Sequence, residues 1–482
     1  MARMDRRTRV LVVAIVVSFI AFLDGAVINV ALPSIAAELG GGLALQQWAV
    51  DAYLLTLGSL ILLAGSLSDS FGRLRIIRIG LYGFAATSMI CALAPDGIIF
   101  VIGRALQGAA GALLVPSSLA LIIATFPRNE QGRAIGRWTA WTTAAFLVGP
   151  LLGGALVDLV SWRLAFWINL LPIAAVLVIM HALGRDDADA HRERIDWVGA
   201  ALGIVGLGGT VFALIEQGRF GWDSPAVFVP FVVGVLALVA FVLWERRVSQ
   251  PMLPLSLFDA RNFATGNLAT FFIYASFALG PFAMAIFLQE TGGFPATLAG
   301  LATLPPTIML VLLGSWFGGL STRFGPRIFM TLGPIIVAVG YLLTVTVQEE
   351  LNYWLQFLPG ILAVGLGMAM TVAPLTSAIL GAVDPARAGI GSAVNNAVAR
   401  IAGLVAIASV GMIVGTQLDV GGYRRAAIAT AVFLVVGGVI SWLGIRNPPL
   451  STESNTEAAD AAGPDAAGTT TTSSDPTTPR AD

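Results

Sequence analysis

The sequence predicts an all-α integral membrane protein with fourteen transmembrane helices, arranged as two six-helix halves with two further helices inserted between them. Of its 482 residues, 57% are hydrophobic and 11% are charged, whereas soluble domains contain about 25% charged residues. The mean hydropathy is +0.85. The net charge of −1 provides no global field that would recruit nucleic acid. This composition excludes a soluble enzyme, a nucleic-acid binder and a disordered chain.

Fourteen apolar runs are each long enough to cross a bilayer, which takes about 20 residues of helix. They are too long and too uniformly apolar for barrel strands, which alternate in hydropathy and need about 10 residues. The runs cover residues 10–32, 45–67, 75–93, 98–124, 134–157, 163–183, 196–216, 226–245, 263–289, 297–319, 327–347, 353–380, 389–414 and 426–445.

The placement of arginine predicts the orientation of these helices. The sequence contains no lysine, and its 27 basic residues concentrate before the first run and in the even-numbered connections, for example at Arg75, Arg133 and Arg192. The odd-numbered connections carry acidic residues such as Glu38 and Asp96. Because cytoplasmic loops hold the excess of basic residues, both termini are predicted to be cytoplasmic. We expect a multi-pass protein of the plasma or inner membrane.

An internal repeat relates the two ends of the chain. Residues 65–73 (GSLSDSFGR) align without gaps with residues 318–326 (GGLSTRFGP), an offset of 253 residues or eight helices. Such self-similarity indicates a duplicated architecture, and two halves related in this way form a transporter with its substrate site between them. We expect an N-terminal half over 1–183, a loop and two inserted helices over 184–247, a C-terminal half over 248–446 and a disordered cytoplasmic tail over 447–482.

Two charged residues lie inside predicted helices of the first half. A carboxylate at the depth of Asp24 costs at least about 2.5–3.5 kcal/mol and indicates a functional site, unless a neighbour satisfies it structurally. Arg104 shares one helical face with Gln107 and Gly108, and its permanent charge needs an anion, a cavity or backbone carbonyls. We expect Asp24 to exchange protons, because burial in the membrane disfavours the charged form of its carboxyl group.

Asp51 has two interpretations. Its predicted depth is similar to that of Asp24 and Arg104, which allows a cluster that attracts a cation or binds a second proton. Alternatively, Asp51 only interacts with the dipole at the start of the second helix.

Other polar and aromatic residues are candidates for substrate contacts. Aromatic side chains such as Tyr274 could line a pocket, although Tyr and Trp also anchor helices at membrane interfaces. Arg400 and Asn395 belong to a polar strip of the thirteenth run, where Arg400 contacts either substrate or backbone carbonyls. The candidate substrate contacts are Asp51, Asn29, Gln107, Tyr274 and Asn395.

Several ordered motifs resemble the major facilitator superfamily, and more narrowly its fourteen-helix drug:proton antiporters. Phe22–Pro33 is similar to the family signature of the first helix, and Gly65–Arg73 to the superfamily loop motif. Arg104–Gly108 resembles the motif linked to proton transfer, and Gly149–Gly154 the antiporter motif of the fifth helix. The stretch Gly391–Arg400 also looks family-like.

The resemblance implies a division of roles. Asp24 would exchange protons, and Arg104 would tune that exchange. Contacts at the cytoplasmic helix ends would stabilise one conformation, and small residues of the fifth helix would let it pack tightly as the halves rock. The residues in these conformational roles are Asp69, Gly72, Arg73, Gly149, Pro150, Gly153 and Gly154.

The leading hypothesis is proton-coupled antiport that exports amphipathic drugs, dyes or antibiotics through a monomer in the lipid bilayer. It needs no cofactor, because a proton gradient drives it. An endogenous metabolite or lipid is an alternative substrate, and a non-transporting membrane receptor is the alternative outside transport. No enzyme is expected, because the sequence offers no nucleophile and base pair, and its two histidines and single cysteine form no metal-binding pattern.

Overall fold

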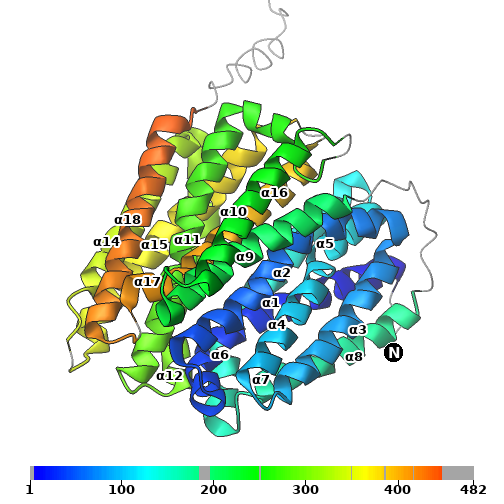
Figure 1. The fold of residues 1–482 in the computed structure, drawn as a ribbon. Helices are drawn as coiled ribbons and strands as arrows, with labels where there is room; N and C mark the ends of the chain where they lie inside the picture. The colour runs from blue at the N-terminus through cyan, green and yellow to red at the C-terminus, as the bar shows by residue number, and fades with distance from the viewer. Residues whose placement is uncertain are drawn as a thin grey trace, which may run out of the picture. The chain divides into compact units, whose positions relative to one another are not determined.

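The computed structural model describes residues 5–183, 196–248, 251–348, 350–384, 387–415 and 417–447, except the side chains of Leu62, Asp69 and Arg128. Over these residues the regular structure is entirely helical (Figure 1). Thirteen helices are long and apolar enough to span a membrane, and α2 adds another of 30 residues. All fourteen predicted runs coincide with helices, which confirms the predicted fold class. The predicted loop at 184–195 and nearly all of the predicted tail lie outside the described residues.

The helices follow the chain in three groups. The N-terminal half contains α1 (Arg6–Leu39), α2 (Gly42–Phe71), α3 (Arg73–Ala92), α4 (Gly97–Ala112), α5 (Val115–Thr125), α6 (Arg128–Leu159), α7 (Leu164–Trp167) and α8 (Leu170–His181). The inserted pair is α9 (Trp197–Phe220) and α10 (Pro225–Glu245). The C-terminal half contains η1 (Leu255–Asp259), α11 (Arg261–Glu290), α12 (Ala296–Ala302), α13 (Leu304–Phe324), α14 (Pro326–Thr344), η2 (Tyr353–Phe357), α15 (Leu358–Leu380), α16 (Ala388–Ala408), α17 (Val410–Val414) and α18 (Val420–Gly444).

Prolines explain why some apolar runs form two helices. A proline ring clashes with the carbonyl four residues earlier and has no N–H to donate. Pro116 lies four residues after the last residue of α4, and Pro306 lies four residues after the last residue of α12. Pro172 lies four residues after Ile168, where the chain leaves α7. Each of these predicted transmembrane runs therefore consists of two helices separated by one short break.

The two halves repeat one packing pattern at the predicted offset of eight helices. In the N-terminal half α1 packs against α6 and α8, α2 against α4, and α3 against α4 and α8. The C-terminal half has the equivalent pairs: α11 with α16 and α18, α13 with α15, and α14 with α15 and α18. The halves meet where α2 packs on α16 and α6 packs on α12 and α13. This arrangement confirms two six-helix halves with two inserted helices.

The repeated sequence motif forms the same one-residue turn in both halves. Gly72 separates α2 from α3 with φ 92°, and Gly325 separates α13 from α14 with φ 81°. L-residues with side chains rarely adopt positive φ, so glycine is required at both turns. The turn fixes the angle at which each helix pair reverses across the membrane.

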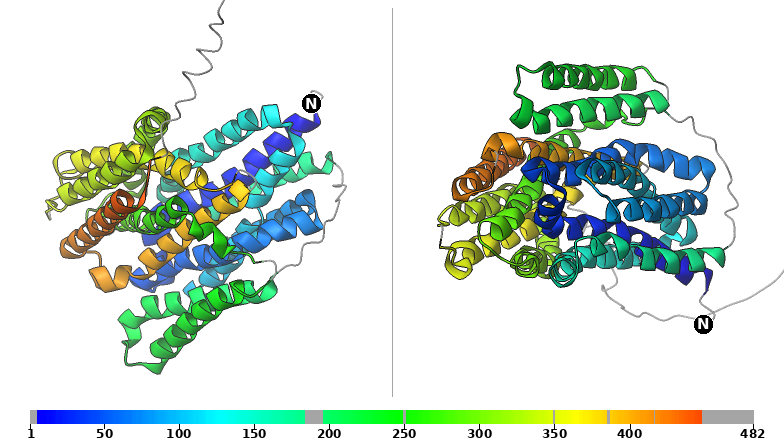
Figure 2. Two further views of the ribbon diagram at one scale, coloured as in Figure 1. Left: turned by 90° about the horizontal axis from the view of Figure 1, so that it is seen from above. Right: turned by 60° about the horizontal axis from the view of Figure 1, so that its bottom comes forward.

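The inserted pair lies on the outside of the bundle, as Figure 2 shows for α9 and α10 (green). Small residues let these two helices approach closely, since a Cβ at Gly209 would lie 2.4 Å from the Pro230 carbonyl oxygen. Trp48 of α2 donates a 2.9 Å hydrogen bond to Glu216 of α9 and so ties the pair to the N-terminal half. Many side chains of α10 are exposed and apolar, as expected for a helix that faces lipid.

Candidate functional site

A buried ion pair occupies the interior of the N-terminal half. Arg104 Nη1 of α4 lies 2.7 Å from Asp24 Oδ2 of α1. Asp24 is 3% exposed and Arg104 is 1% exposed, so both charges are removed from solvent. Charges in this position are tolerated only when they are paired and when their remaining donors and acceptors are satisfied. The two residues predicted to couple protons are therefore in direct contact.

Amide and hydroxyl side chains complete the hydrogen bonding of this pair. Asp24 Oδ1 accepts from Gln107 Nε2 and from Asn169 Nδ2, both at 3.0 Å. Gln107 also accepts a 2.7 Å bond from Arg104 Nη1 and donates a 2.9 Å bond to the hydroxyl of Ser88. We call Asp24, Ser88, Arg104, Gln107 and Asn169 the Asp24 network. It closes the carboxylate off from water and gives it three protein donors.

The α2 backbone supports the arginine from the other side. Arg104 Nε donates a 2.9 Å bond to the Ala49 carbonyl, and its guanidinium carbon lies 4.5 Å from the centre of the Tyr53 ring. This contact requires close approach of α4 to α2, because a Cβ at Gly108 would lie 2.2 Å from the Tyr53 carbonyl oxygen. The glycine on the predicted polar face of α4 thus permits the geometry of the ion pair.

Asp51 lies outside the Asp24 network. Its side chain is fully buried, and neither carboxylate oxygen has a hydrogen-bond partner among the described residues. It shares a face of α2 with Gln47, which donates to two carbonyls of α16, and with Gly58, which approaches Arg400. Asp51 therefore faces the C-terminal half.

The structure corrects the position that each sequence interpretation gave to Asp51. The predicted cluster does not form, since Arg104 binds Asp24 and not Asp51. A role at the start of the helix is also wrong, because α2 begins at Gly42, more than two turns before Asp51. The apolar pattern suggested a start near residue 45, and three consecutive glycines before that point concealed the true beginning of the helix.

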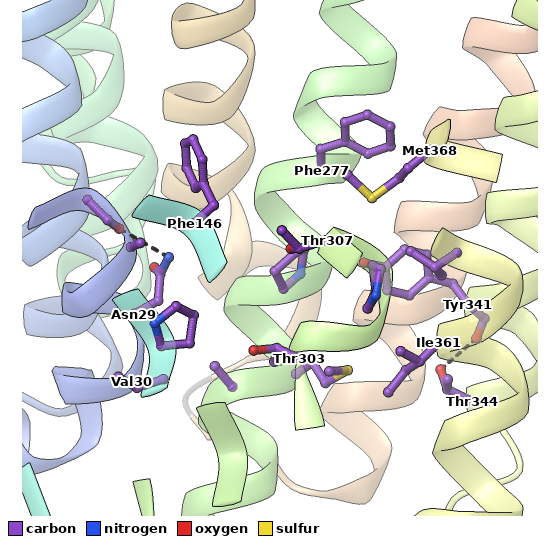
Figure 3. Close-up of a pocket in the computed structure, with 18 residues that line it drawn as sticks. Asn29, Val30, Phe146, Phe277, Thr303, Thr307, Tyr341, Thr344, Ile361 and Met368 are labelled. Carbon is purple, nitrogen blue, oxygen red and sulfur yellow. Dashed lines mark hydrogen bonds between the residues drawn. The ribbon is translucent and has the colours of Figure 1, made fainter. Parts of the chain in front are cut away.

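A cavity of about 240 Å³ lies between the two halves (Figure 3). One wall comes from α1 and α6, including Asn29, Phe146 and Pro150, and the opposite wall comes from helices of the C-terminal half. None of the described residues that line it is charged. Carbons, aromatic rings, one amide and a few hydroxyls form a surface suited to an apolar molecule with a few polar groups. The residues of the opposite wall are Phe277, Pro281, Met284, Ala285, Thr303, Pro306, Thr307, Tyr341, Thr344, Ile361, Val364 and Met368.

The predicted substrate contacts occupy different places. Asn29 lines the cavity, whereas Gln107 belongs to the Asp24 network. Tyr274 lies beside the cavity, with its ring centre 5.6 Å from that of Phe277. Asn395 donates 2.9 Å and 3.2 Å bonds to Thr270 and Asn267 and so joins α16 to α11 within the C-terminal half.

The small residues of α6 form tight contacts on two sides. A Cβ at Gly149 would lie 2.5 Å from Ala26 Cβ of α1, and one at Gly153 would lie 2.9 Å from Val30 Cγ2. On the other side, a Cβ at Gly154 would lie 2.5 Å from Thr297 Cα of α12. The motif thus lets α6 touch its own half and the opposite half at nearly the same level. The helix runs continuously through Pro150.

Side-chain hydrogen bonds join the two halves near the ends of these helices. Asp158 accepts from the backbone N–H groups of Ala296 and Thr297 at 3.0 Å and 2.8 Å, and so caps α12 from α6. Gln46 of α2 donates to Glu290 of α11. These contacts lie at the ends that the arginine pattern assigns to the outer side.

The loop motif is described in part. Gly72 forms the turn already noted, and Arg73 is the first residue of α3. The side chain of Asp69 lies outside the described part of the structure.

Sequence reasoning missed two members of the Asp24 network, Ser88 and Asn169. Asn169 stands between Ile168 and Leu170 in an apolar run, so a buried amide with a specific partner could have been suspected there. Ser88 carries no comparable signal, because serine is common in membrane helices and can bond its own backbone. Among the described residues no group of three or more His, Cys, Asp or Glu could hold a metal ion.

The fold and the site together define a membrane transporter built from two duplicated halves. A sequence profile of the Major Facilitator Superfamily matches residues 14–406, with a second match over 266–477. The chain therefore belongs to the major facilitator superfamily. It is a transporter and not an enzyme.

Several relatives are described as resistance proteins. A methylenomycin A resistance protein of Bacillus subtilis (strain 168) is 33% identical, and the match covers 90% of this chain and 92% of the relative. The puromycin resistance protein pur8 of Streptomyces alboniger is 32% identical, with 95% and 94% covered. The multidrug resistance protein Stp of Mycobacterium tuberculosis (strain CDC 1551 / Oshkosh) is 32% identical, with 83% and 74% covered. These relatives confirm the predicted resemblance to the drug antiporter family.

Solved structures show the same fold at low sequence identity. The peptide transporter POT in complex with sulfate superposes with a TM-score of 0.67 at 15% identity, covering 90% of this chain and 94% of that one. A bacterial homologue of the lysosomal transporter Spinster, in an inward-facing and unoccupied conformation, gives a TM-score of 0.63 at 18% identity, with 92% and 97% covered.

Proposed function

We propose that this transporter is a proton-coupled antiporter that exports amphipathic drugs, dyes or antibiotics from the cytoplasm by alternating access. One observation carries the proposal: α1 holds the buried carboxylate of Asp24 and, at the adjacent residue Gly25, lines the cavity between the halves. A change of charge at Asp24 therefore acts on the helix that forms one wall of the cavity. The resistance relatives support an exported drug or antibiotic as substrate.

Asp24 is the proposed proton carrier. In this network its carboxylate is buried and has three protein donors. Protonation removes the charge that Arg104 neutralises, so the guanidinium would be left buried without a counter-ion. The network must then rearrange, and the packing of α1 against α6 must change with it. Asp51, buried without a partner, is a second candidate for proton exchange.

The contacts between the halves support an inward-open conformation. Asp158 and Gln46 join the halves at the predicted outer ends of their helices. The positive-inside pattern supports cytoplasmic termini. In this orientation, substrate enters from the cytoplasm, and the outer contacts separate before release. We further propose that the protein works as a monomer in the plasma or inner membrane, and that its parts divide at residues 183, 247 and 446.

Transport by reconstituted protein tests this function. Proteoliposomes would be given an inward or outward pH gradient, and uptake of a panel of neutral and charged aromatic dyes would be followed by fluorescence. Antiport predicts accumulation that reverses with the direction of the gradient and that is abolished by a protonophore. Equal uptake with and without the gradient would contradict proton coupling. Absence of transport, together with specific ligand binding, would favour a receptor.

Self-made metabolites are the second candidate substrate class. Two further relatives are described as a probable actinorhodin transporter and as a tetracenomycin C resistance and export protein. They are 33% and 30% identical to this chain. Deletion of the gene followed by analysis of the culture medium separates the candidates, because loss of one secreted compound favours an endogenous substrate.

A further inference from the structure

Arg400 is a charged side chain inside the bundle that has no counter-ion among the residues the structure describes. It lies in the middle of α16 and is partly buried. Among the described residues no carboxylate pairs with it and no backbone carbonyl accepts a hydrogen bond from it. An arginine at membrane depth is costly without an anion or a water-filled cavity. Packing against carbonyls, one of the two roles considered from the sequence, is thus not observed.

The guanidinium of Arg400 lies near aromatic side chains. Its central carbon lies 5.9 Å from the centre of the Phe22 ring. Tyr53 and Tyr274 are close enough to interact electrostatically with it. The methylene stem starts at the interface between the halves, where Arg400 Cβ would lie 3.6 Å from a Cβ at Gly58 of α2. A cation over an aromatic face is stabilised by about 0.5–2 kcal/mol. This contact uses none of the hydrogen-bond donors of Arg400, so they remain available to a ligand.

Two aromatic pairs connect Arg400 with the cavity. In the N-terminal half, the Phe22 ring lies 5.5 Å from that of Phe146, which lines the cavity. In the C-terminal half, the Tyr274 ring lies 5.6 Å from that of Phe277, which lines the opposite wall. The first pair ends at Phe22, whose ring lies near the Arg400 guanidinium, and the second ends at Tyr274, which interacts electrostatically with Arg400.

The order of residues places Arg400 on the cytoplasmic side of the cavity in the proposed orientation. Phe22 is one turn before the cavity residue Gly25 on α1, and Tyr274 is one turn before Phe277 on α11. Both helices run outward from the cytoplasm. A substrate that enters from the cytoplasm therefore meets Arg400 before it fills the cavity.

The charges near the cavity favour an anion. Asp24 is neutralised by Arg104 and hydrogen-bonded by Gln107 and Asn169. Asp51 forms no ion pair with Arg400, and its oxygens are fully enclosed. The cavity itself is lined by uncharged residues. Arg400 is thus the unpaired charge, among the described residues, that faces the aromatic pairs.

We infer that Arg400 is the anion-recognising end of an extended substrate site, and that the preferred substrates are amphipathic organic acids. The apolar body of such a molecule occupies the cavity, and its carboxylate or phenolate accepts hydrogen bonds from the guanidinium. This inference rests on the proposed export function, which it refines by naming the substrate class. Bonds between charged partners of this kind are about twice as strong as neutral ones.

Matched ligands test the inference directly. A fluorescent naphthyl carboxylic acid and its primary amide have nearly the same apolar body and differ in charge. Equilibrium binding to the purified full-length protein is expected to be at least tenfold tighter for the acid. Arg400→Gln should remove this preference by weakening acid binding at least tenfold, while amide binding stays within twofold. Arg400→Lys should retain part of the preference, because it keeps the charge and loses the planar set of donors.

The controls separate the site from general damage. Arg219→Gln changes an arginine that packs on Phe220 at the end of α9, away from the cavity, and should leave both affinities unchanged. Unchanged amide binding shows that Arg400→Gln is folded; if that variant does not fold, the Lys variant and the wild-type pH dependence decide. Acid binding should weaken below the pKa of the ligand, whereas amide binding should not.

Each outcome bears on a different claim. Equal affinity of the wild type for acid and amide, or an equal loss of both in Arg400→Gln, would overturn the anion site while leaving export possible. Selective acid binding that depends on Arg400, without gradient-driven uptake in proteoliposomes, would support the site and contradict the export function. Acid-selective uptake that is lost in Arg400→Gln supports both.

Discussion

Arg104 Nη1 lies 2.7 Å from Asp24 Oδ2, so that an ion pair joins α4 to α1 inside the N-terminal half. The same nitrogen donates to Gln107, and the Nε of the same guanidinium donates to the Ala49 carbonyl. One arginine thus connects three helices, because Ala49 lies on α2. Any change in the charge of Asp24 must be accommodated by all three helices, which makes the pair a suitable element for coupling.

Asp24→Asn is expected to abolish accumulation driven by a pH gradient. Asparagine has nearly the same shape but carries no exchangeable charge, and it leaves Arg104 without a counter-ion. Substrate exchange without a gradient should persist, since the cavity residues are untouched. Parallel uptake assays in proteoliposomes, with and without a gradient, measure both quantities. Full gradient-driven uptake by the variant would exclude Asp24 as the proton carrier.

Arg104→Ala is expected to be severely impaired, and Arg104→Lys only partly active. Removal of one partner from a buried ion pair costs about 3–5 kcal/mol, since the other charge remains buried. Lysine restores a charge, but its single nitrogen cannot reproduce the bonds that Arg104 makes through Nε and Nη1. Thermal unfolding and uptake as a function of pH provide the measurements. Wild-type pH dependence in the alanine variant would separate Arg104 from the proton pathway.

Asp51→Asn is expected to increase thermal stability. The buried carboxylate lacks hydrogen-bond partners among the described residues, and an unsatisfied charged group costs more to bury than a neutral amide. A rise in the melting temperature of the purified protein checks this expectation. Efflux of matched cationic and neutral dyes tests whether Asp51 also attracts cationic substrates. If Asp51→Asn reduces efflux of the cationic dye more than that of the neutral dye, this role is supported. Equal reductions would exclude it.

Gly149→Ala is expected to reduce transport and stability, while Gly136→Ala on the same helix should change neither. The added Cβ at Gly149 meets Ala26 Cβ at 2.5 Å, whereas nothing lies within 4 Å of a Cβ at Gly136. Overpacking of this kind costs about 1–3 kcal/mol. Uptake rates and melting temperatures of the two variants form a matched comparison. Equal behaviour of the pair would show that the α1 and α6 contact has room to adjust.

The helices could be predicted from the sequence because hydropathy is a local property of each run. The breaks after α4 and α12 also have a local cause, in Pro116 and Pro306, although the apolar pattern continues across them. The contact between Asp24 and Arg104 could also be predicted from the sequence, because both charges need a partner and both lie at a similar depth.

Contacts between distant helices could not be predicted in the same way. Whether Asn169 would reach Asp24 depends on how the chain turns between α7 and α8, so Asn169 acquires its role only in the folded protein. The isolation of Asp51 has a similar origin: its depth resembles that of Asp24, but it lies on the opposite side of α2 from Ala49 and Tyr53, which contact Arg104.

The cap that Asp158 forms on α12 must break when the outer ends of the two halves separate, so its free energy contributes to the cost of that conformational change. Loss of a helix cap costs roughly 0.5–2 kcal/mol, and the N–H group of Thr297 is in an exposed position where water can replace the carboxylate. One elementary charge that crosses 100 mV releases about 2.3 kcal/mol. The free energy released by one proton crossing this potential would therefore be enough to break the cap that Asp158 forms on α12. Deuterium incorporation at the Thr297 amide would then record how often the outer end opens, without any substrate present.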